Sequence, residues 1–193
     1  LGNIYANEAL FHCRLDPQRL TNTLTKKQVG KLIQSCRHVL ELSLKNGADW
    51  IALSFVRSEN DFSIVRSKIK GLGYNIPIMA KIEKWEAVKS MDKIIETFDA
   101  VMVARGDLGV ELPIETLPPI QKRLVKQCRD SGKPVIVATQ MMESMIKSSI
   151  PTRAEVSDVA QAIYDGVDAV MLSAETAIGN HPEKVISTVD KIA

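Results

Sequence analysis

Residues 76–83 read Ile-Pro-Ile-Met-Ala-Lys-Ile-Glu, a short and almost continuously apolar run that closes on charged side chains. Four further runs have the same character: Trp50-Ile-Ala-Leu-Ser-Phe-Val56, Asp99-Ala-Val-Met-Val-Ala104, Pro134-Val-Ile-Val-Ala-Thr139 and Asp168-Ala-Val-Met-Leu-Ser173. Strands that are buried on both faces of a parallel sheet have this composition. The runs therefore predict five strands of one parallel sheet.

Helical patterns separate these runs. Residues 156–163 carry apolar side chains at helical spacing behind a Thr152-x-x-Glu155 capping box, and the pattern ends at Gly166. Similar apolar stripes lie at 85–95, 120–128 and 185–189, and a longer one at 29–40 precedes the first strand. The predicted order is a helix followed by five β/α units, which requires right-handed crossovers.

This order suits a β/α barrel or an open doubly wound sheet. No Gly-x-Gly-x-x-Gly or phosphate-loop motif follows any run, which disfavours the nucleotide-binding open sheets. A closed barrel has eight strands and typically about 250 residues, whereas this chain has 193 residues. We therefore predict an α/β fold, a partial TIM (β/α)8 barrel with about five β/α units in residues 25–193, and leave residues 1–24 unassigned. Because the chain begins with Leu1 rather than Met, we expect a piece of a longer protein.

The composition is that of an ordinary globular protein, with 45% hydrophobic and 25% charged residues. The balance of 25 basic against 23 acidic residues, with no run of like charges, predicts neither nucleic acid nor a membrane as a partner. Three widely spaced cysteines predict neither a disulfide framework nor a thiolate zinc site, and favour a cytoplasmic location.

Polar side chains gather where the predicted strands end, which is where function collects in both candidate folds. Lys81 and Glu83 share one face of their strand, because side chains alternate along a strand. Glu83 and Asp107, from neighbouring strand ends, could supply two oxygen ligands to one Mg²⁺. Lys81 would then neutralise negative charge or carry a proton. The backbone of Gly106 and Asp107 offers N–H groups to an anion.

Each of these features also has an ordinary structural explanation. A Lys-x-Glu pair on a strand is commonly a structural ion pair, a Gly-Asp-x-Gly segment is commonly only a turn, and Thr139 suits a strand as a β-branched residue. Their coincidence at one end of successive strands favours a functional site.

At these residues the sequence resembles the pyruvate kinase family. Ile78-Met-Ala-Lys-Ile-Glu83 is similar to the strand with the family's catalytic lysine and first metal-binding glutamate. Met102-Val-Ala-Arg-Gly-Asp-Leu-Gly109 is similar to the second metal-binding segment, and Ala138-Thr-Gln-Met-Met-Glu-Ser-Met-Ile146 to the segment with the substrate threonine. Residues 151–160 and 171–177 continue the correspondence in order, so that the resemblance covers about 24–193.

The resemblance implies the glycolytic transfer of a phosphoryl group from phosphoenolpyruvate to ADP, giving pyruvate and ATP. It implies that Lys81 stabilises the phosphoryl group in flight, and that Glu83 and Asp107 hold Mg²⁺ (or Mn²⁺). It further implies a substrate carboxylate on the N–H groups of Gly106 and Asp107 and on the Thr139 hydroxyl. Thr139 and Ser173 would serve enolate protonation, and Ser54 would bind substrate. Full-length members use K⁺ and form homo-oligomers, with a tetramer as the family's usual state.

The sequence also departs from the family pattern. Ala174 stands where the family usually has Gly, and Lys84 where Asn is common. We find no Thr-Ile-Gly-Pro-type turn, no Asn-Phe-Ser-His segment with the K⁺ ligands, no lid domain and no carboxyl-terminal regulatory domain. We therefore expect the divalent-metal and enolate half of a site, with weak or no turnover in the isolated chain.

Two alternatives remain open at this point. One is a Mg²⁺-enolate aldolase or lyase on a β/α barrel, which would use the same Lys, Glu and Asp cluster. The other is a non-catalytic fragment whose unpaired strand edges assemble with a complementary half.

Overall fold

The computed structural model describes residues 3–193 and contains all five predicted strands, each somewhat shorter than its apolar run. The strands are β1 (Ile51–Leu53), β2 (Ile78–Ile82), β3 (Ala100–Ala104), β4 (Val135–Ala138) and β5 (Ala169–Met171). Every pair of neighbours is parallel, and the order across the sheet is β1-β2-β3-β4-β5. This sequential order is that of a β/α barrel, because a doubly wound sheet reverses its strand order at a switch point. The fold is therefore a partial β/α barrel, as predicted.

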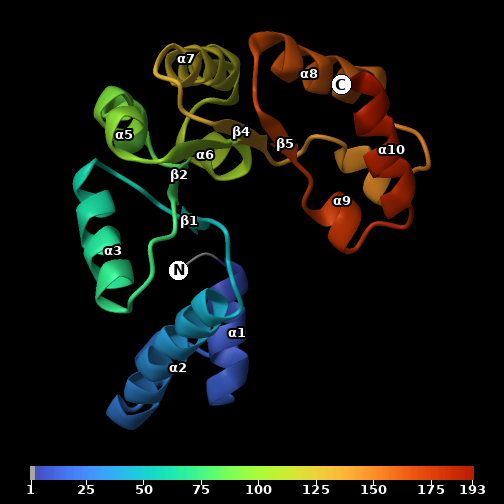
Figure 1. Ribbon diagram of the computed structural model, residues 1–193. Helices are drawn as coiled ribbons and strands as arrows, with labels where there is room; N and C mark the ends of the chain where they lie inside the picture. The colour runs from blue at the N-terminus through green and yellow to red at the C-terminus, as the bar shows by residue number, and fades with distance from the viewer. Residues whose placement is uncertain (1–2) are drawn as a thin grey trace.

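Helices connect successive strands and follow the sheet in an arc (Figure 1). Their bounds are α1 (Asn3–Cys13), α2 (Lys26–Lys45), α3 (Asn60–Gly71), α4 (Trp85–Lys89), α5 (Met91–Thr97), α6 (Arg105–Glu111), α7 (Leu117–Asp130), α8 (Arg153–Asp165), α9 (Ala174–Ala177) and α10 (Pro182–Ile192). Short 3-10 turns lie at η1 (Thr21–Thr23), η2 (Ile114–Thr116) and η3 (Glu143–Ile146). The stripe at 85–95 forms two helices rather than one, because Ser90 ends α4 and begins α5 with φ −101° and ψ 14°.

Helix α8 begins and ends as its sequence predicts. The Thr152 side chain accepts a hydrogen bond from the Glu155 N–H, and the Glu155 side chain accepts one from the Thr152 N–H, so the capping box is present. Gly166 ends the helix at φ 90°, in the left-handed region that glycine enters without strain. A Cβ at this position would lie 2.6 Å from Arg129 Nε, so a larger residue would also displace the Arg129 side chain of α7.

Residues 3–24 contain a helix that the sequence did not predict. Helix α1 packs against α2, and the two lie together at one end of the chain (Figure 1). The rings of His12 and His38 lie 4.7 Å apart across this contact. The apolar residues of α1 do not form one helical stripe, which is why periodicity did not reveal it.

The core lies between the sheet and the helices around it. It includes fully buried side chains of β2, β3, β4, α5 and α7, such as Leu124, together with Phe98 in the turn between α5 and β3. Cys128 belongs to this core, and burial, followed by the nearby Asp168 carboxylate, raises the pKa of its thiol to about 12. All three cysteines are free. Within residues 3–193 no helix combines the length and the apolar character needed to cross a membrane.

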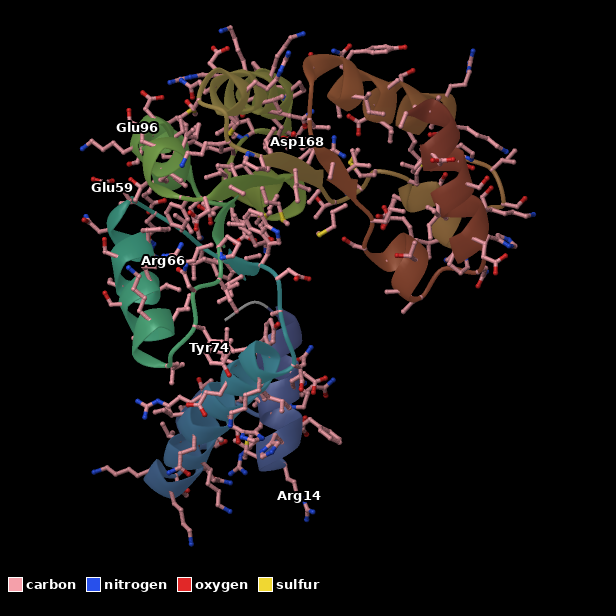
Figure 2. The ribbon with its side chains drawn as sticks, in the orientation of Figure 1. Arg14, Glu59, Arg66, Tyr74, Glu96 and Asp168 are labelled. Atoms are coloured by element: carbon pink, nitrogen blue, oxygen red, sulfur yellow. The ribbon has the colours of Figure 1, made fainter. Side chains whose placement is uncertain are left out.

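Two aspartates fix the amino ends of neighbouring strands in the same way. Asp168, just before β5, accepts a 2.7 Å hydrogen bond from the Val135 N–H at the start of β4, and its own N–H donates to the Val135 carbonyl. Asp99, just before β3, makes the same exchange with Ile78 at the start of β2 and also pairs with Arg66 of α3. Figure 2 shows Asp168 at β5 and Arg66 on α3. These paired hydrogen bonds set the register of neighbouring strands at their amino ends.

We expect the Asp168→Ala substitution to lower the free energy of unfolding by about 1–3 kcal/mol, because it leaves the buried Val135 N–H without its carboxylate acceptor. Urea unfolding measures this change. Asp130→Ala is the matched control, since the only contact described for Asp130's carboxylate is an exposed ion pair with Lys126, and we expect a change within about 0.5 kcal/mol. Equal effects of the two substitutions would contradict the register role of Asp168.

Candidate functional site

The carboxyl edge of the sheet brings the predicted site residues together. Parallel pairing sets Ile82 beside Val103 and Ala104 beside Ala138, so the residues that follow these strands emerge at the same edge. Glu83 follows β2, Arg105 opens α6 directly after β3, and Thr139 follows β4. The candidate site therefore consists of the loops at this edge.

Glu83 is a fully enclosed charged group at this edge, with a relative exposure of 1%. Its Oε2 accepts a 2.7 Å hydrogen bond from the Phe55 N–H, and its Oε1 lies beside Lys81 Nζ in an ion pair. Lys81 Nζ also donates to Ser54 Oγ at 3.3 Å. Phe55 has φ 57°, a left-handed conformation that turns its N–H toward the carboxylate. The ends of β1 and β2 are thus connected through one buried carboxylate.

The carboxylate oxygens at this edge are of the chemical type that a hard divalent cation binds. Glu83 Oε1 is fully buried, and its ion pair with Lys81 is the one contact described for it, which leaves a lone pair for a further ligand. The carboxylate of Asp107, in the first turn of α6, is exposed and has no hydrogen bond or ion pair within the described part of the chain. Within residues 3–193 no cluster of three or more His, Cys, Asp or Glu side chains is arranged to hold a metal. Mg²⁺ suits a site with two carboxylates, because it retains water and substrate oxygens as its other ligands.

Gly106 and Thr139 lie in direct contact. The Gly106 N–H donates a 2.7 Å hydrogen bond to Thr139 Oγ1, and this hydroxyl in turn donates to the Ala138 carbonyl at 2.6 Å. The two groups that the resemblance assigns to one substrate carboxylate are therefore neighbours. In this structure they form a hydrogen bond with each other. An anion that bound to both would replace this hydrogen bond.

The loop after β4 has a strained backbone. Thr139 and Gln140 have φ 74° and 53°, and two consecutive left-handed residues that are not glycine are uncommon. Arg105 holds this conformation: its guanidinium donates to the Thr139 carbonyl at 2.8 Å and to the Gln140 carbonyl at 3.3 Å. Asp158 of α8 fixes the guanidinium from the other side with hydrogen bonds of 2.8 and 2.7 Å.

Two further carboxylates hold the β4–α8 loop and the start of α9. Glu155 accepts 2.6 Å hydrogen bonds from the Ser144 N–H and from the Ser144 hydroxyl. Burial opposes ionisation, but the hydrogen bonds from Ser144 and Thr152 outweigh it and hold the pKa of Glu155 below its usual value. Glu175 of α9, with an exposure of 1%, accepts hydrogen bonds from the N–H groups of Met142 and Ser173.

Ser173 is half-buried at the start of α9, after β5. Its N–H is bound to Glu175, and no hydrogen bond between the hydroxyls of Ser173 and Thr139 occurs within residues 3–193. Both residues nevertheless follow adjacent strands, because β4 and β5 pair. The structure thus brings Ser54, Lys81 and Glu83 into contact, and Gly106 and Thr139 into contact.

The two departures from the family pattern are accommodated locally. Ala174 opens α9 and is absent from the described residues with positive φ, so the missing Gly does not strain this turn. Lys84 forms an ion pair with Glu111 of α6, so its charge is balanced beside the site.

Several groups that organise this edge were not identified from the sequence as functional. Arg105, Asp158 and Glu175 lie in segments that resemble the family, but the sequence alone assigned no role to any of them. Their roles depend on where the loop carbonyls and N–H groups point, which a linear pattern does not contain. The one feature of the sequence that could have indicated a role for Glu175 is its position as an acidic residue between small residues shortly after a strand.

A sequential parallel sheet with an ion pair and a buried carboxylate at its carboxyl edge defines a β/α-barrel protein. The family model described as "Pyruvate kinase, barrel domain" matches residues 21–186. The chain belongs to the pyruvate kinase family.

Individual relatives agree with this assignment. The chain is 56% identical over 153 residues to the pyruvate kinase of Corynebacterium glutamicum, an alignment that covers 79% of this chain and 32% of the relative. It is 53% identical over 165 residues to that of Methylorubrum extorquens, covering 86% and 34%. A crystal structure of a pyruvate kinase from Cryptosporidium parvum matches with a TM-score of 0.79 and 43% identity, covering 82% and 34%. The chain thus spans about a third of the length of these relatives.

We expect the Arg105→Lys substitution to loosen the loop after β4, because an ammonium cannot bind Asp158 in two places and also reach the Thr139 carbonyl. Hydrogen exchange followed by mass spectrometry should show about tenfold faster exchange in residues 139–142, as for the loss of one hydrogen bond. Arg123→Lys on the exposed face of α7 is the control and should leave this segment unchanged. Similar exchange in both variants would show that Arg105 does not hold the loop.

Proposed function

We propose that this chain carries the divalent-metal and enolate half of a site that transfers a phosphoryl group from phosphoenolpyruvate to ADP, giving pyruvate and ATP. The observation that carries this proposal is the pair of Lys81 on β2 and Glu83 directly after it, an ammonium and a buried carboxylate at the carboxyl edge of a pyruvate kinase barrel. Phosphoryl transfer requires positioning and charge neutralisation rather than covalent chemistry by the protein. These residue types suit that requirement.

Each residue has a role that follows from its surroundings. The Lys81 ammonium, held by Ser54 and Glu83, is oriented to neutralise charge on a transferring phosphoryl group. The Gly106 N–H and the Thr139 hydroxyl would receive the substrate carboxylate, together with the N–H of Asp107, in exchange for their mutual hydrogen bond. Ser54 would contact substrate beside Lys81, and Thr139 and Ser173 would serve proton delivery to the enolate.

Glu83 and Asp107 would hold Mg²⁺ or Mn²⁺. When bound, the cation would supply charge neutralisation to phosphate and enolate oxygens. K⁺ belongs to the proposed reaction as a family cofactor, and we assign none of its ligands to this chain. Because the chain spans about a third of its relatives, we propose weak turnover for the chain alone.

The remaining assignments follow from the same family. We propose residues 25–193 as the barrel part and residues 1–24 as a separate segment, which is supported by the start of the family match at residue 21. We propose that the full-length protein forms a homo-oligomer and binds neither nucleic acid nor a membrane. A cytoplasmic location is supported by three free cysteines.

The proposal predicts that phosphoenolpyruvate binds to the chain in the presence of Mg²⁺. We expect Lys81→Gln to weaken this binding at least about tenfold, because it removes the ammonium that faces the phosphoryl group. Isothermal titration calorimetry measures the binding, and a lactate-dehydrogenase-coupled assay with ADP and K⁺ measures turnover, which we expect to be weak.

The matched control is Lys89→Gln, an exposed lysine on α4 that lies over the Trp85 ring. Absence of Mg²⁺-dependent binding, or equal weakening by both substitutions, would overturn the proposal. A turnover rate close to that of a complete pyruvate kinase would show instead that the chain carries more than half of the site.

A further inference from the structure

Glu175 is an unusual group in this fold because its carboxyl is buried without a cation. Its exposure is 1%, and the salt bridges of residues 3–193 do not include it. A buried carboxyl is costly unless both oxygens have hydrogen-bond donors. Here Oε1 accepts from the Met142 N–H at 3.2 Å and Oε2 from the Ser173 N–H at 2.7 Å.

The two donors belong to different loops of the carboxyl edge. Met142 lies three residues after Thr139 in the loop that follows β4, and Ser173 lies in the loop that follows β5. Both N–H groups lie outside regular helices and strands, and Glu175 is the acceptor described for each. One carboxyl group therefore connects the loop of Thr139 to the loop of Ser173.

The surroundings of Glu175 leave it little freedom to move. Met141, Met142 and Met145 are fully buried, so the loop after β4 is packed where Glu175 reaches it. The Asn180 N–H donates to the Ile146 carbonyl at 2.9 Å, which holds the segment after α9 against η3. A Cβ at Gly179 would lie 2.1 Å from the Glu175 carbonyl oxygen, so the chain passes directly over the backbone of Glu175.

We propose that Glu175 is a positioning residue that fixes the Thr139 loop relative to the Ser173 loop, and so sets the groups that serve enolate protonation. The inference rests on the proposed function for the roles of Thr139 and Ser173. Glu175 itself touches neither substrate nor cation, and it acts through two backbone N–H groups.

The connection continues to a third loop. Thr139 Oγ1 accepts the Gly106 N–H, so a shift of the Thr139 loop changes the environment of an amide on α6. No contact between Glu175 and Gly106 is described, so an effect of Glu175 on this amide would pass through the Thr139 loop. The Gly106 amide is therefore a readout of the position of the Thr139 loop.

The test compares Glu175→Gln with Glu143→Gln by amide hydrogen exchange and ¹⁵N chemical shifts. The glutamine amide keeps the shape but offers one oxygen, so it must turn an NH₂ group toward one of the two N–H donors. Glu143 lies in the same β4–α8 loop with an exposed carboxylate and no described hydrogen bond, so it controls for the charge change. We expect about tenfold faster exchange at both Met142 and Ser173 and a shifted Gly106 amide in Glu175→Gln only.

A measurement on the unmodified chain covers the case in which Glu175→Gln does not fold. Since one carboxyl holds both amides, Met142 and Ser173 should exchange with similar protection and the same dependence on denaturant, although they lie on different loops. Independent exchange of the two amides would overturn the inference. So would a Glu175→Gln variant in which only one loop responds or the Gly106 amide does not shift.

The functional arm uses pyruvate and Mg²⁺ in D₂O, in which the loss of a methyl proton gives the enolate and a deuteron returns to the same carbon. At saturating pyruvate we expect Glu175→Gln to lower the methyl exchange rate about tenfold, with unchanged half-saturation, and Glu143→Gln to leave both unchanged. An unchanged rate in Glu175→Gln would overturn the positioning role. If the unmodified chain exchanges no methyl protons, the proposed function fails, and the amide measurements decide the loop connection separately.

Discussion

The carboxylate of Glu83 is the group on which the candidate site depends. A carboxylate with 1% exposure requires hydrogen-bond donors, and for Glu83 both a donor and a compensating charge come from neighbouring strand ends. The Phe55 N–H satisfies one oxygen, and this requires the left-handed backbone after β1. Lys81, two residues earlier on β2, supplies the charge and extends the contact to Ser54. The buried Glu83 side chain therefore holds both the turn after β1 and the ammonium of Lys81.

Other carboxylates around the sheet also accept hydrogen bonds from backbone N–H groups. Glu175 and Glu155 accept backbone N–H groups in the loop after β4, and Asp99 and Asp168 do so at the opposite ends of the strands. Carboxylate oxygens are well suited to this role, because an ionised carboxylate accepts hydrogen bonds and has no hydrogen of its own that would require an acceptor. The aspartates fix the register at the amino ends, whereas the glutamates fix the loops at the carboxyl ends. The strand register and the site geometry are thus maintained by separate sets of acidic side chains.

The parts of the molecule that could be predicted from the sequence are those in which a short local pattern of residues determines the structure. Apolar runs identified the five strands, and the Thr152 capping box with Gly166 identified α8. The sequence also grouped Lys81 with Glu83, because alternation along a strand is a local property. Periodicity continued across Ser90, where the chain breaks into two helices, and it gave no signal for α1.

What the sequence did not predict depends on contacts between distant segments. The positive φ values of Thr139 and Gln140 are imposed by Arg105, whose guanidinium is held in turn by Asp158 of α8. The role of Glu175 depends on two N–H groups, one of which lies 33 residues away in the chain. Such groups become identifiable only when the fold sets the loops side by side.

The most direct test of the central role of Glu83 is a Mn²⁺ titration of the chain followed by electron paramagnetic resonance. We predict one bound Mn²⁺ whose affinity falls at least about tenfold in Glu83→Gln, because the cation loses a carboxylate ligand. Glu86→Gln, an exposed glutamate on the neighbouring α4, should leave the affinity unchanged. Equal Mn²⁺ affinity in the Glu83→Gln variant and the unmodified chain would contradict the account.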